Sequence, residues 1–283
     1  MDMKTGRPLS EARLHIVGHY HQEQLIETIE KILSDHHTID SLEMPDLAAF
    51  DEMHVGGREA SLSLARKARL QAGDLLLDVG CGIGGPSRML SHDFEMKVVG
   101  LDLTASYCRI ASALSQAVKG SVPLGFINGD ALALPFKTAT FEVIWTQHCS
   151  MNISNKEGLY HEFKRILQKG GRLLIHDIVQ GVQSPVLYPT PWAMSPENSF
   201  LQSKESLGKT LQNAGFKVDH REIISEQALE WYARMKASKS RRKPPLFSQK
   251  LLFGDALPMM AGNMRQNLQE HRIEVLEAIC TRK

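Results

Sequence analysis

The sequence contains no long hydrophobic segment. No apolar run approaches the roughly 20 residues that an α-helix needs to cross a bilayer. The N-terminal stretch MDMKTGRPLSEARLHIVGHYH also lacks the apolar centre of a signal peptide. These absences predict a cytoplasmic protein with no membrane as a partner.

An excess of charge of one sign is also absent. The chain carries 33 Lys and Arg against 32 Asp and Glu, a formal net charge of +1. No basic face is visible, so we expect no nucleic acid as a partner. The short basic run at 238–243, SKSRRK, is interpreted as a solvated helix end rather than as a site for an acidic substrate.

The cysteines and histidines are not spaced as metal ligands or as disulfide partners would be. Cys81, Cys108, Cys149 and Cys280 are scattered without a C-x-x-C pair, and the twelve histidines include no H-E-x-x-H motif. Structural zinc and disulfide frameworks both need regular spacings. We therefore expect neither a metal nor a disulfide.

What the sequence does contain is an alternation of short apolar segments with amphipathic ones. Strands are predicted at 75–79, 97–102, 124–130, 140–147, 171–179, 216–224 and 273–281. Helices are predicted at 10–34, 56–73, 86–94, 105–118, 156–168, 203–214 and 226–237. Strands that alternate with helices indicate a parallel sheet covered on both faces, and the last two strands lack a full crossover between them. The prediction is a doubly wound α/β fold: a mostly parallel seven-stranded sheet with one antiparallel edge strand, helices on both faces and an N-terminal helical segment.

The first strand ends in a glycine-rich turn, LLLDVGCGIGGPSRML. Gly80, Gly82 and Gly85 fit the dinucleotide pattern G-x-G-x-x-G, whereas Gly80, Gly82 and Gly84 fit G-x-G-x-G. A pyrophosphate needs free N–H groups at the start of the following helix. Pro86, which stands there, has no N–H. This weakens the dinucleotide interpretation and leaves it open.

Polar side chains follow three further strands at the edge where α/β sheets bind ligands. Asp102 lies about 20 residues after the glycines, as expected of a carboxylate that accepts hydrogen bonds from ribose. Asp130 follows Asn128 and Gly129, where it could accept from an adenine amino group. The segment WTQHCSMN places polar groups where the reactive end of a cofactor would lie. Singly, either aspartate could instead be a helix N-cap or a turn residue.

Together these motifs resemble the class I S-adenosylmethionine-dependent methyltransferases. DVGCGIGG resembles their glycine motif, GLDL their ribose-binding acid, NGDALALPF their adenine loop, and EFKRILQKGGRLLI the helix and fifth strand that follow. The resemblance covers roughly residues 50–179. LDVGCGIGGPSRML is most similar to small-molecule methyltransferases of the sarcosine/dimethylglycine, phosphoethanolamine and tocopherol kinds, which methylate nitrogen or a ring carbon.

The resemblance implies a division of the chain and a set of cofactor residues. Residues 1–55 would form a helical lid segment and 56–180 the S-adenosylmethionine-binding core. Residues 181–283 would supply the acceptor-site loop and, around a helical insertion, the strands that complete the same sheet. The cofactor-binding residues implied are Gly80, Cys81, Gly82, Gly84, Asp102, Leu103, Asp130, Ala131 and Gln147.

The acceptor site is predicted from residues around the fourth strand end. His148 is the first candidate for a base or an orienting group, because the unperturbed pKa of histidine lies near working pH. His54 is the second catalytic candidate, since the family often folds this stretch over the cofactor. Residues expected to line the acceptor pocket are Tyr20, Met151, Tyr188 and Trp192.

The predicted function is therefore methyl transfer from S-adenosylmethionine to a nitrogen, carbon or oxygen of a small molecule, with S-adenosylhomocysteine as product. Two alternatives stay open: a nicotinamide-dependent oxidoreductase, and a protein that binds S-adenosylmethionine without catalysis. A monomer or a homodimer is expected.

Overall fold

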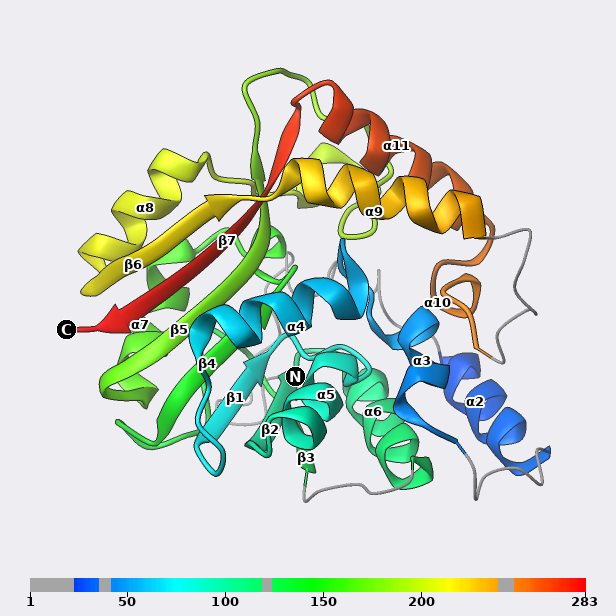
Figure 1. The fold of residues 1–283 in the computed structure, drawn as a ribbon, viewed down its shortest axis with the longest axis horizontal. Coiled ribbons are helices and arrows are strands. Elements are labelled where there is room, and N and C mark those ends of the chain that lie inside the picture. Colours follow the sequence, from blue (N-terminus) through cyan, green and yellow to red (C-terminus); the bar gives the residue numbers. More distant parts are fainter. Residues whose placement is uncertain (1–22, 36–41, 119–123, 239–246) are drawn as a thin grey trace.

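The computed structural model describes residues 23–35, 42–118, 124–238 and 247–283, and Figure 1 shows their arrangement. The strands are β1 (Leu75–Val79), β2 (Lys97–Asp102), β3 (Leu124–Asn128), β4 (Phe141–Gln147), β5 (Leu167–Gln180), β6 (Phe216–Ile223) and β7 (Ile273–Arg282). The α-helices are α2 (Glu23–Asp35), α3 (Met44–Asp51), α4 (Gly57–Ala68), α5 (Gly85–Asp93), α6 (Ala105–Ala117), α7 (Lys156–Ile166), α8 (Lys204–Asn213), α9 (Ser225–Ser238), α10 (Lys250–Phe253) and α11 (Leu257–Gln269). Short 3₁₀ turns lie at Ser150–Asn152, Pro196–Asn198 and Gly254–Ala256.

The strands form one seven-stranded sheet in the order β3-β2-β1-β4-β5-β7-β6. β1 pairs in parallel with both β2 and β4, and β4 pairs in parallel with β5. β7 runs antiparallel to β5 and β6. The prediction of a mostly parallel seven-stranded sheet with one antiparallel edge strand is confirmed in its strand number and directions. The structure adds that this strand lies one place in from the edge, because β6 pairs outside it.

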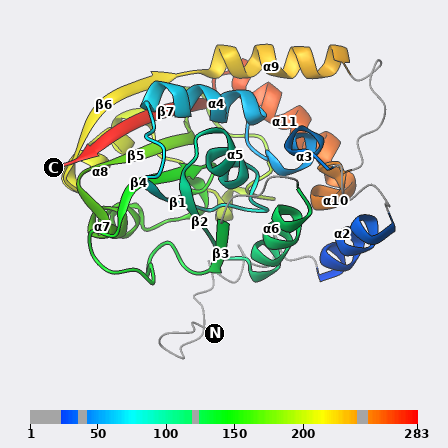
Figure 2. The ribbon, with the colours of Figure 1, turned by 60° about the horizontal axis from the view of Figure 1, so that its bottom comes forward.

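Both faces of the sheet are covered, which explains the uninterrupted apolar sequence of β1. Leu76 packs with residues of α4 and α5, whereas the adjacent Leu77 packs with residues of α7 and α8. Successive side chains of a strand point to opposite faces, so a strand between two helical layers needs apolar residues at every position. Figure 2 shows α4 and α5 above the sheet and α7 and α8 below it.

The helices outside the alternating core were predicted less completely. The predicted helix at 10–34 is helical from Glu23 to Asp35, and its earlier part lies outside the described residues. Helix α3 was not predicted. It spans eight residues, with Pro45 in its first turn. The Glu43 N–H, just before the helix, donates to the Asp46 carboxylate at 3.0 Å. Helices α10 and α11 were also missed, since they form the insertion that joins β6 to β7.

This insertion covers the sheet beyond the end of β5. Ala228 of α9 and Met264 of α11 share a buried cluster with Ile178 of β5 and with Trp192 from the loop that follows. Figure 1 shows α9 and α11 side by side at this end of the molecule. Within the described ranges, no helix is both long and apolar enough to pass through a membrane.

Candidate functional site

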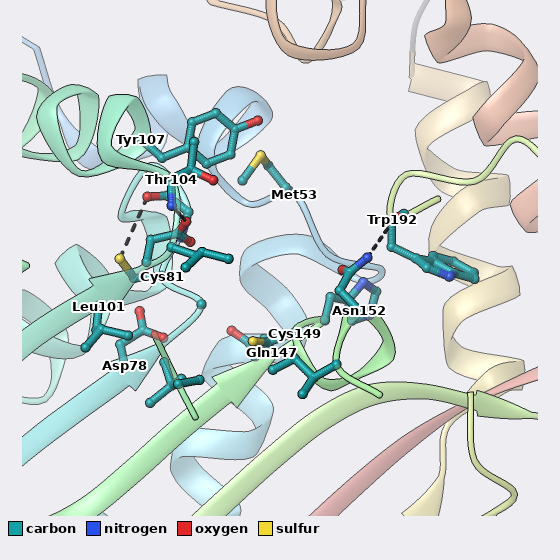
Figure 3. A pocket seen from close by; sticks show the side chains of 18 of the residues that line it. Met53, Asp78, Cys81, Leu101, Thr104, Tyr107, Gln147, Cys149, Asn152 and Trp192 are labelled. Atoms are coloured by element: carbon teal, nitrogen blue, oxygen red, sulfur yellow. Dashed lines mark hydrogen bonds between the residues drawn. The ribbon is translucent and has the colours of Figure 1, made fainter. Parts of the chain in front are cut away.

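A concave site lies at the carboxyl end of β1. The sheet order reverses there, with β2 and β3 on one side and β4 and β5 on the other, which is where open α/β sheets bind ligands. A pocket at this point is lined by the ends of β1 to β4, by residues 51, 53 and 54 of the N-terminal segment, and by Pro191 and Trp192. Figure 3 shows Trp192 and Asn152 at the opposite end of the pocket from Asp78 and Leu101.

The glycine turn lies directly against other parts of the pocket. Gly80 and Gly82 both have positive φ, 76° and 53°, which glycine adopts at little cost. A Cβ at Gly80 would lie 2.6 Å from Cys149 Sγ, and one at Gly82 would lie 2.5 Å from Met53 Cε. A Cβ at Gly80 would also lie 2.7 Å from Cys149 Cβ and does not fit there, whereas the flexible end of Met53 could move away from a Cβ at Gly82. Gly84, also with positive φ, faces Phe126 instead and is not part of the pocket lining.

Asp102, at the end of β2, joins the turn to the next helix. One carboxylate oxygen accepts the Gly82 N–H at 2.9 Å, and the other accepts the Thr104 N–H at 2.8 Å. Burial raises the pKa of this carboxyl, and the two backbone hydrogen bonds oppose that shift. An ionised carboxylate has about four acceptor positions. The Thr104 hydroxyl is a third donor to this carboxylate, so about one acceptor position is left to face the pocket.

Asp78, the last polar residue within β1, also lines the pocket and was not predicted. It is 2% exposed, and Ser87 donates a 2.5 Å hydrogen bond to it. Burial raises its pKa to about 7; the Ser87 bond opposes the shift and the nearby Asp102 adds to it. An acid inside an otherwise apolar strand was the available sequence signal, because an acid is rarely buried without a partner.

The residues predicted to hold the adenine follow β2 and β3. Leu103, Asp130 and Ala131 all line the pocket, as does Cys81, which follows β1 and was predicted to lie against the methionine portion. One oxygen of Asp130 accepts the Leu132 N–H at 2.8 Å, which fixes the turn after β3. Thr104 and Tyr107, which were not predicted, line the same end.

Gln147 presents an unpaired donor. Its Oε1 accepts hydrogen bonds from Trp145 Nε1 at 2.9 Å and from Ser61 Oγ at 3.2 Å, so its amide orientation is fixed. Its Nε2 is buried and has no partner among the described residues. A buried N–H without an acceptor costs about 1–3 kcal/mol. Because Gln147 lines the pocket, a ligand acceptor there would remove that cost.

Three histidines gather beside Gln147. The ring centroids of His54 and His148 are 6.0 Å apart, and each lies within 5.4 Å of the ring of His176 on β5. Burial, and secondarily the other two rings, lower the pKa of His148 well below its usual range. Burial and His176 lower the pKa of His54 to about 3. Both pocket-lining histidines are therefore neutral at pH 7.

The hydrogen bonds of the cluster separate its members. His54 Nε2 lies 3.0 Å from the Gly57 carbonyl and 3.0 Å from Ser61 Oγ, whereas His148 Nε2 is buried without a partner among the described residues. His176 was not predicted; it contacts the Val55 carbonyl at 3.1 Å and faces the Glu277 carboxylate at 3.5 Å. His148, at the end of β4 with φ 45°, is thus the histidine with a ring nitrogen available to a ligand.

The acceptor-site predictions divide into three groups. Met151 and Trp192 line the pocket and are 1% and 3% exposed. Tyr188 packs against the cluster that contains Trp192 but is not itself part of the lining. Tyr20 lies outside the described residues.

The N-terminal wall of the pocket is anchored by a buried ion pair that the sequence did not predict. Arg88 of α5 donates to Asp51 of α3 at 2.6 Å and to the Ile83 carbonyl at 2.8 Å, and both charged side chains are about 5% exposed or less. Met53 and His54 follow Asp51 directly. The pair therefore holds these two residues over the glycine turn.

Part of the chain is similar in sequence to a known domain family and to named enzymes. Residues 77–175 match the family model described as "Methyltransferase domain". Phosphoethanolamine N-methyltransferase 1 of Arabidopsis thaliana is 28% identical over 180 residues, which are 64% of this chain and 35% of that protein. The chain thus spans about a third of the length of this curated relative.

Solved structures share the fold over nearly the whole chain. Phosphoethanolamine N-methyltransferase 2 of Haemonchus contortus, solved with phosphomonomethylethanolamine and S-adenosylhomocysteine, has a TM-score of 0.72 at 19% identity over 98% of this chain and 61% of that one. Geranyl diphosphate C-methyltransferase of Streptomyces coelicolor A3(2) has a TM-score of 0.66 at 15% identity. The match covers 98% of this chain and 100% of that enzyme's chain. These likenesses show a common fold.

Proposed function

We propose that this chain, which contains a methyltransferase domain and has the fold of the class I S-adenosylmethionine-dependent methyltransferases, transfers a methyl group to a small molecule. The observation that carries the proposal is the arrangement at the switch point of the sheet. The Gly80–Gly82 turn, the Asp102 carboxylate and the unpaired amide of Gln147 converge on one pocket. The similar enzymes named above are methyltransferases, and none of them is a nicotinamide oxidoreductase.

The described residues fit S-adenosylmethionine by their shape and chemistry. Gly80 and Gly82 leave the backbone bare where a Cβ would collide with neighbouring side chains. Asp102 has an acceptor position left for a ribose hydroxyl, and Asp130 and Leu103 line the part of the pocket where an adenine would be held. Gln147 Nε2 would donate to the carboxylate of the methionine portion. When bound, this cofactor supplies a methyl group activated by a sulfonium.

The protein's own contribution is to orient the acceptor and to exclude water. An in-line displacement needs the nucleophile held about 3–3.5 Å from the reacting carbon. The neutral His148 ring can accept a hydrogen bond from an acceptor O–H or N–H at its unpaired nitrogen and so fix the direction of a lone pair. A histidine whose pKa is lowered holds a proton weakly, so His148 suits orientation better than proton storage. His54 stands beside it as a second polar wall.

The remaining parts of the proposal concern organisation. Residues 1–55 serve as a lid segment, 56–180 as the cofactor core, and 181–283 as the acceptor-site loop with the strands that complete the sheet. The contacts of Asp51, Met53 and His54 with the pocket support the first assignment. We expect a cytoplasmic monomer or homodimer that acts without nucleic acid or a metal.

Two measurements test the proposal. Calorimetry should detect S-adenosylmethionine binding to the purified protein and no binding of NAD or NADP. Release of S-adenosylhomocysteine should then be followed with a panel of amines, phenols, quinols and sterols. Binding without release on any acceptor would favour a non-catalytic S-adenosylmethionine-binding protein, and absence of binding would refute the proposed function.

A further inference from the structure

Among the residues that the structure describes, no cationic side chain lines the acceptor side of the pocket. Within the described ranges, neither lysine nor arginine occurs among the residues that line it. The only described lining side chains that could gain a positive charge by taking up a proton are His54 and His148, and the pKa values of both are lowered. The lining therefore offers no positive charge to an anionic acceptor.

Cationic groups just behind the lining are already engaged. Arg88 donates to Asp51, Ser115 and two backbone carbonyls. Lys156, 7% exposed, donates to the Ser150 carbonyl and faces the buried Asp177. Lys67 is held between Glu277 and Glu222 at 2.7 and 2.9 Å. Moving any of them toward a ligand would leave a carboxylate unpaired, which is strongly destabilising when the pair is buried.

Much of the wall at this side is apolar, beside the polar His54, His148, Asn152 and Ser154. The apolar lining comes from four separate parts of the chain: Met53, Met151 with Ile153, Pro191 with Trp192, and Phe253. Trp192 is oriented by hydrogen bonds at both ends: its Nε1 donates to Ser199 Oγ at 2.9 Å, and its carbonyl accepts from Asn152 Nδ2 at 2.6 Å. The indole is therefore held as a fixed apolar surface.

From these walls we infer that the methyl acceptor is an uncharged, largely apolar molecule that carries no phosphate. This inference rests on the proposed function. It separates the chain from the two similar enzymes above, whose names specify phosphoethanolamine and geranyl diphosphate. A phosphate placed in this pocket would lose its hydration without gaining a counter-charge from any described side chain.

The test compares matched pairs of probes on the protein saturated with S-adenosylhomocysteine. The pairs are geraniol with geranyl diphosphate, and hydroquinone with its monophosphate. Dissociation constants from calorimetry should be about 100-fold lower for the uncharged member of a pair, corresponding to two tenfold steps of affinity. Tighter binding of a phosphorylated member, or no binding of either uncharged member, overturns the inference.

Two sets of variants test which residues cause the preference for uncharged probes. Trp192→Ala should weaken binding of the uncharged probes by tenfold or more. Trp192→Phe keeps an aromatic surface, so its dissociation constants should stay within about threefold of the parent's; equal losses in the two variants would contradict an apolar contact. The basic residues 241–243 lie outside the described residues. Replacing all three with alanine should leave the dissociation constants of both members of each pair unchanged. Loss of binding of a phosphorylated probe in that variant would show that these residues supply a cation to the acceptor and would overturn the inference. Failure of S-adenosylhomocysteine itself to bind would refute the proposed function instead.

Discussion

Replacing Asp102 should lower both the affinity for the cofactor and the free energy of unfolding, by amounts that can be measured separately. Its carboxylate holds the Gly82 and Thr104 N–H groups at 2.9 and 2.8 Å and presents its remaining lone pair to the pocket. Asp102→Ala removes all of these interactions. Asp102→Asn keeps one carbonyl oxygen, so it can keep one of the two backbone hydrogen bonds.

The magnitudes follow from the numbers of hydrogen bonds lost. Two backbone donors without an acceptor would cost about 1–3 kcal/mol each if fully buried, and this site is partly exposed. We therefore expect Asp102→Ala to lower the free energy of unfolding by about 2–3 kcal/mol, and Asp102→Asn by about half that. Loss of a charge-assisted hydrogen bond to a ribose should weaken S-adenosylmethionine binding by about 10- to 100-fold in both variants.

Urea unfolding and calorimetry on the same preparations distinguish the two effects. Asp219→Ala, which removes a carboxylate on the distant β6 strand, serves as the control and should leave the dissociation constant unchanged. A folded Asp102→Ala protein that binds S-adenosylmethionine within twofold of the parent would refute the assignment of Asp102 to the ribose.

Three further predictions concern single side chains. Gly80→Ala should abolish S-adenosylmethionine binding because its Cβ would meet Cys149. Gly73 has φ 86° and no atom within 4 Å of an added Cβ, so Gly73→Ala should lower the free energy of unfolding by about 1–2 kcal/mol and leave binding unchanged. Equal binding by the two variants in calorimetry would argue against a cofactor contact at Gly80. His148→Ala should leave cofactor affinity within about threefold of the parent and lower turnover, and unchanged turnover in an S-adenosylhomocysteine release assay would reduce His148 to a pocket wall. Burial, with a smaller contribution from the adjacent Asp51, raises the pKa of Glu52 to about 8 from 4.5, so its folded state binds a proton more tightly than its unfolded state and the resulting stability falls as pH rises from 4.5 to 8. Glu52→Gln should therefore flatten the decline in urea-unfolding free energy between pH 5 and pH 8, and an unchanged slope would count against a protonated Glu52.

The parts of the fold predicted from sequence are those determined by local pattern. β1 could be predicted because its apolar run leads directly into glycines, and Asp102 could be placed because the strand before it ends at a fixed distance from that turn. Parallel strands bring their carboxyl ends to one edge, so the order of motifs along the chain was enough to bring Asp130 and Gln147 beside the same pocket.

The parts that were missed depend on contacts between distant segments. His176 is one of several residues in an apolar strand, and its position beside His54 follows from the path of residues 52–55 across the end of β5. No periodicity encodes that path. Tyr188 illustrates the converse: an aromatic residue in a proline-rich loop was expected in the pocket, but the loop directs Trp192 there and leaves Tyr188 in the supporting cluster.

The Arg88–Asp51 pair links the two halves of the site. Arg88 is in the helix that begins at the glycine turn, and its guanidinium also binds the Ile83 carbonyl within that turn. Asp51 precedes Met53 and His54, which form part of the acceptor wall. Because a buried ion pair resists the loss of either partner, the cofactor turn and the acceptor wall are held at a fixed separation. Under the proposed function we therefore expect acceptor selection to depend on α5 as well as on the side chains that touch the acceptor. Calorimetry on an Arg88→Ala variant should show weaker binding of both S-adenosylmethionine and the acceptor.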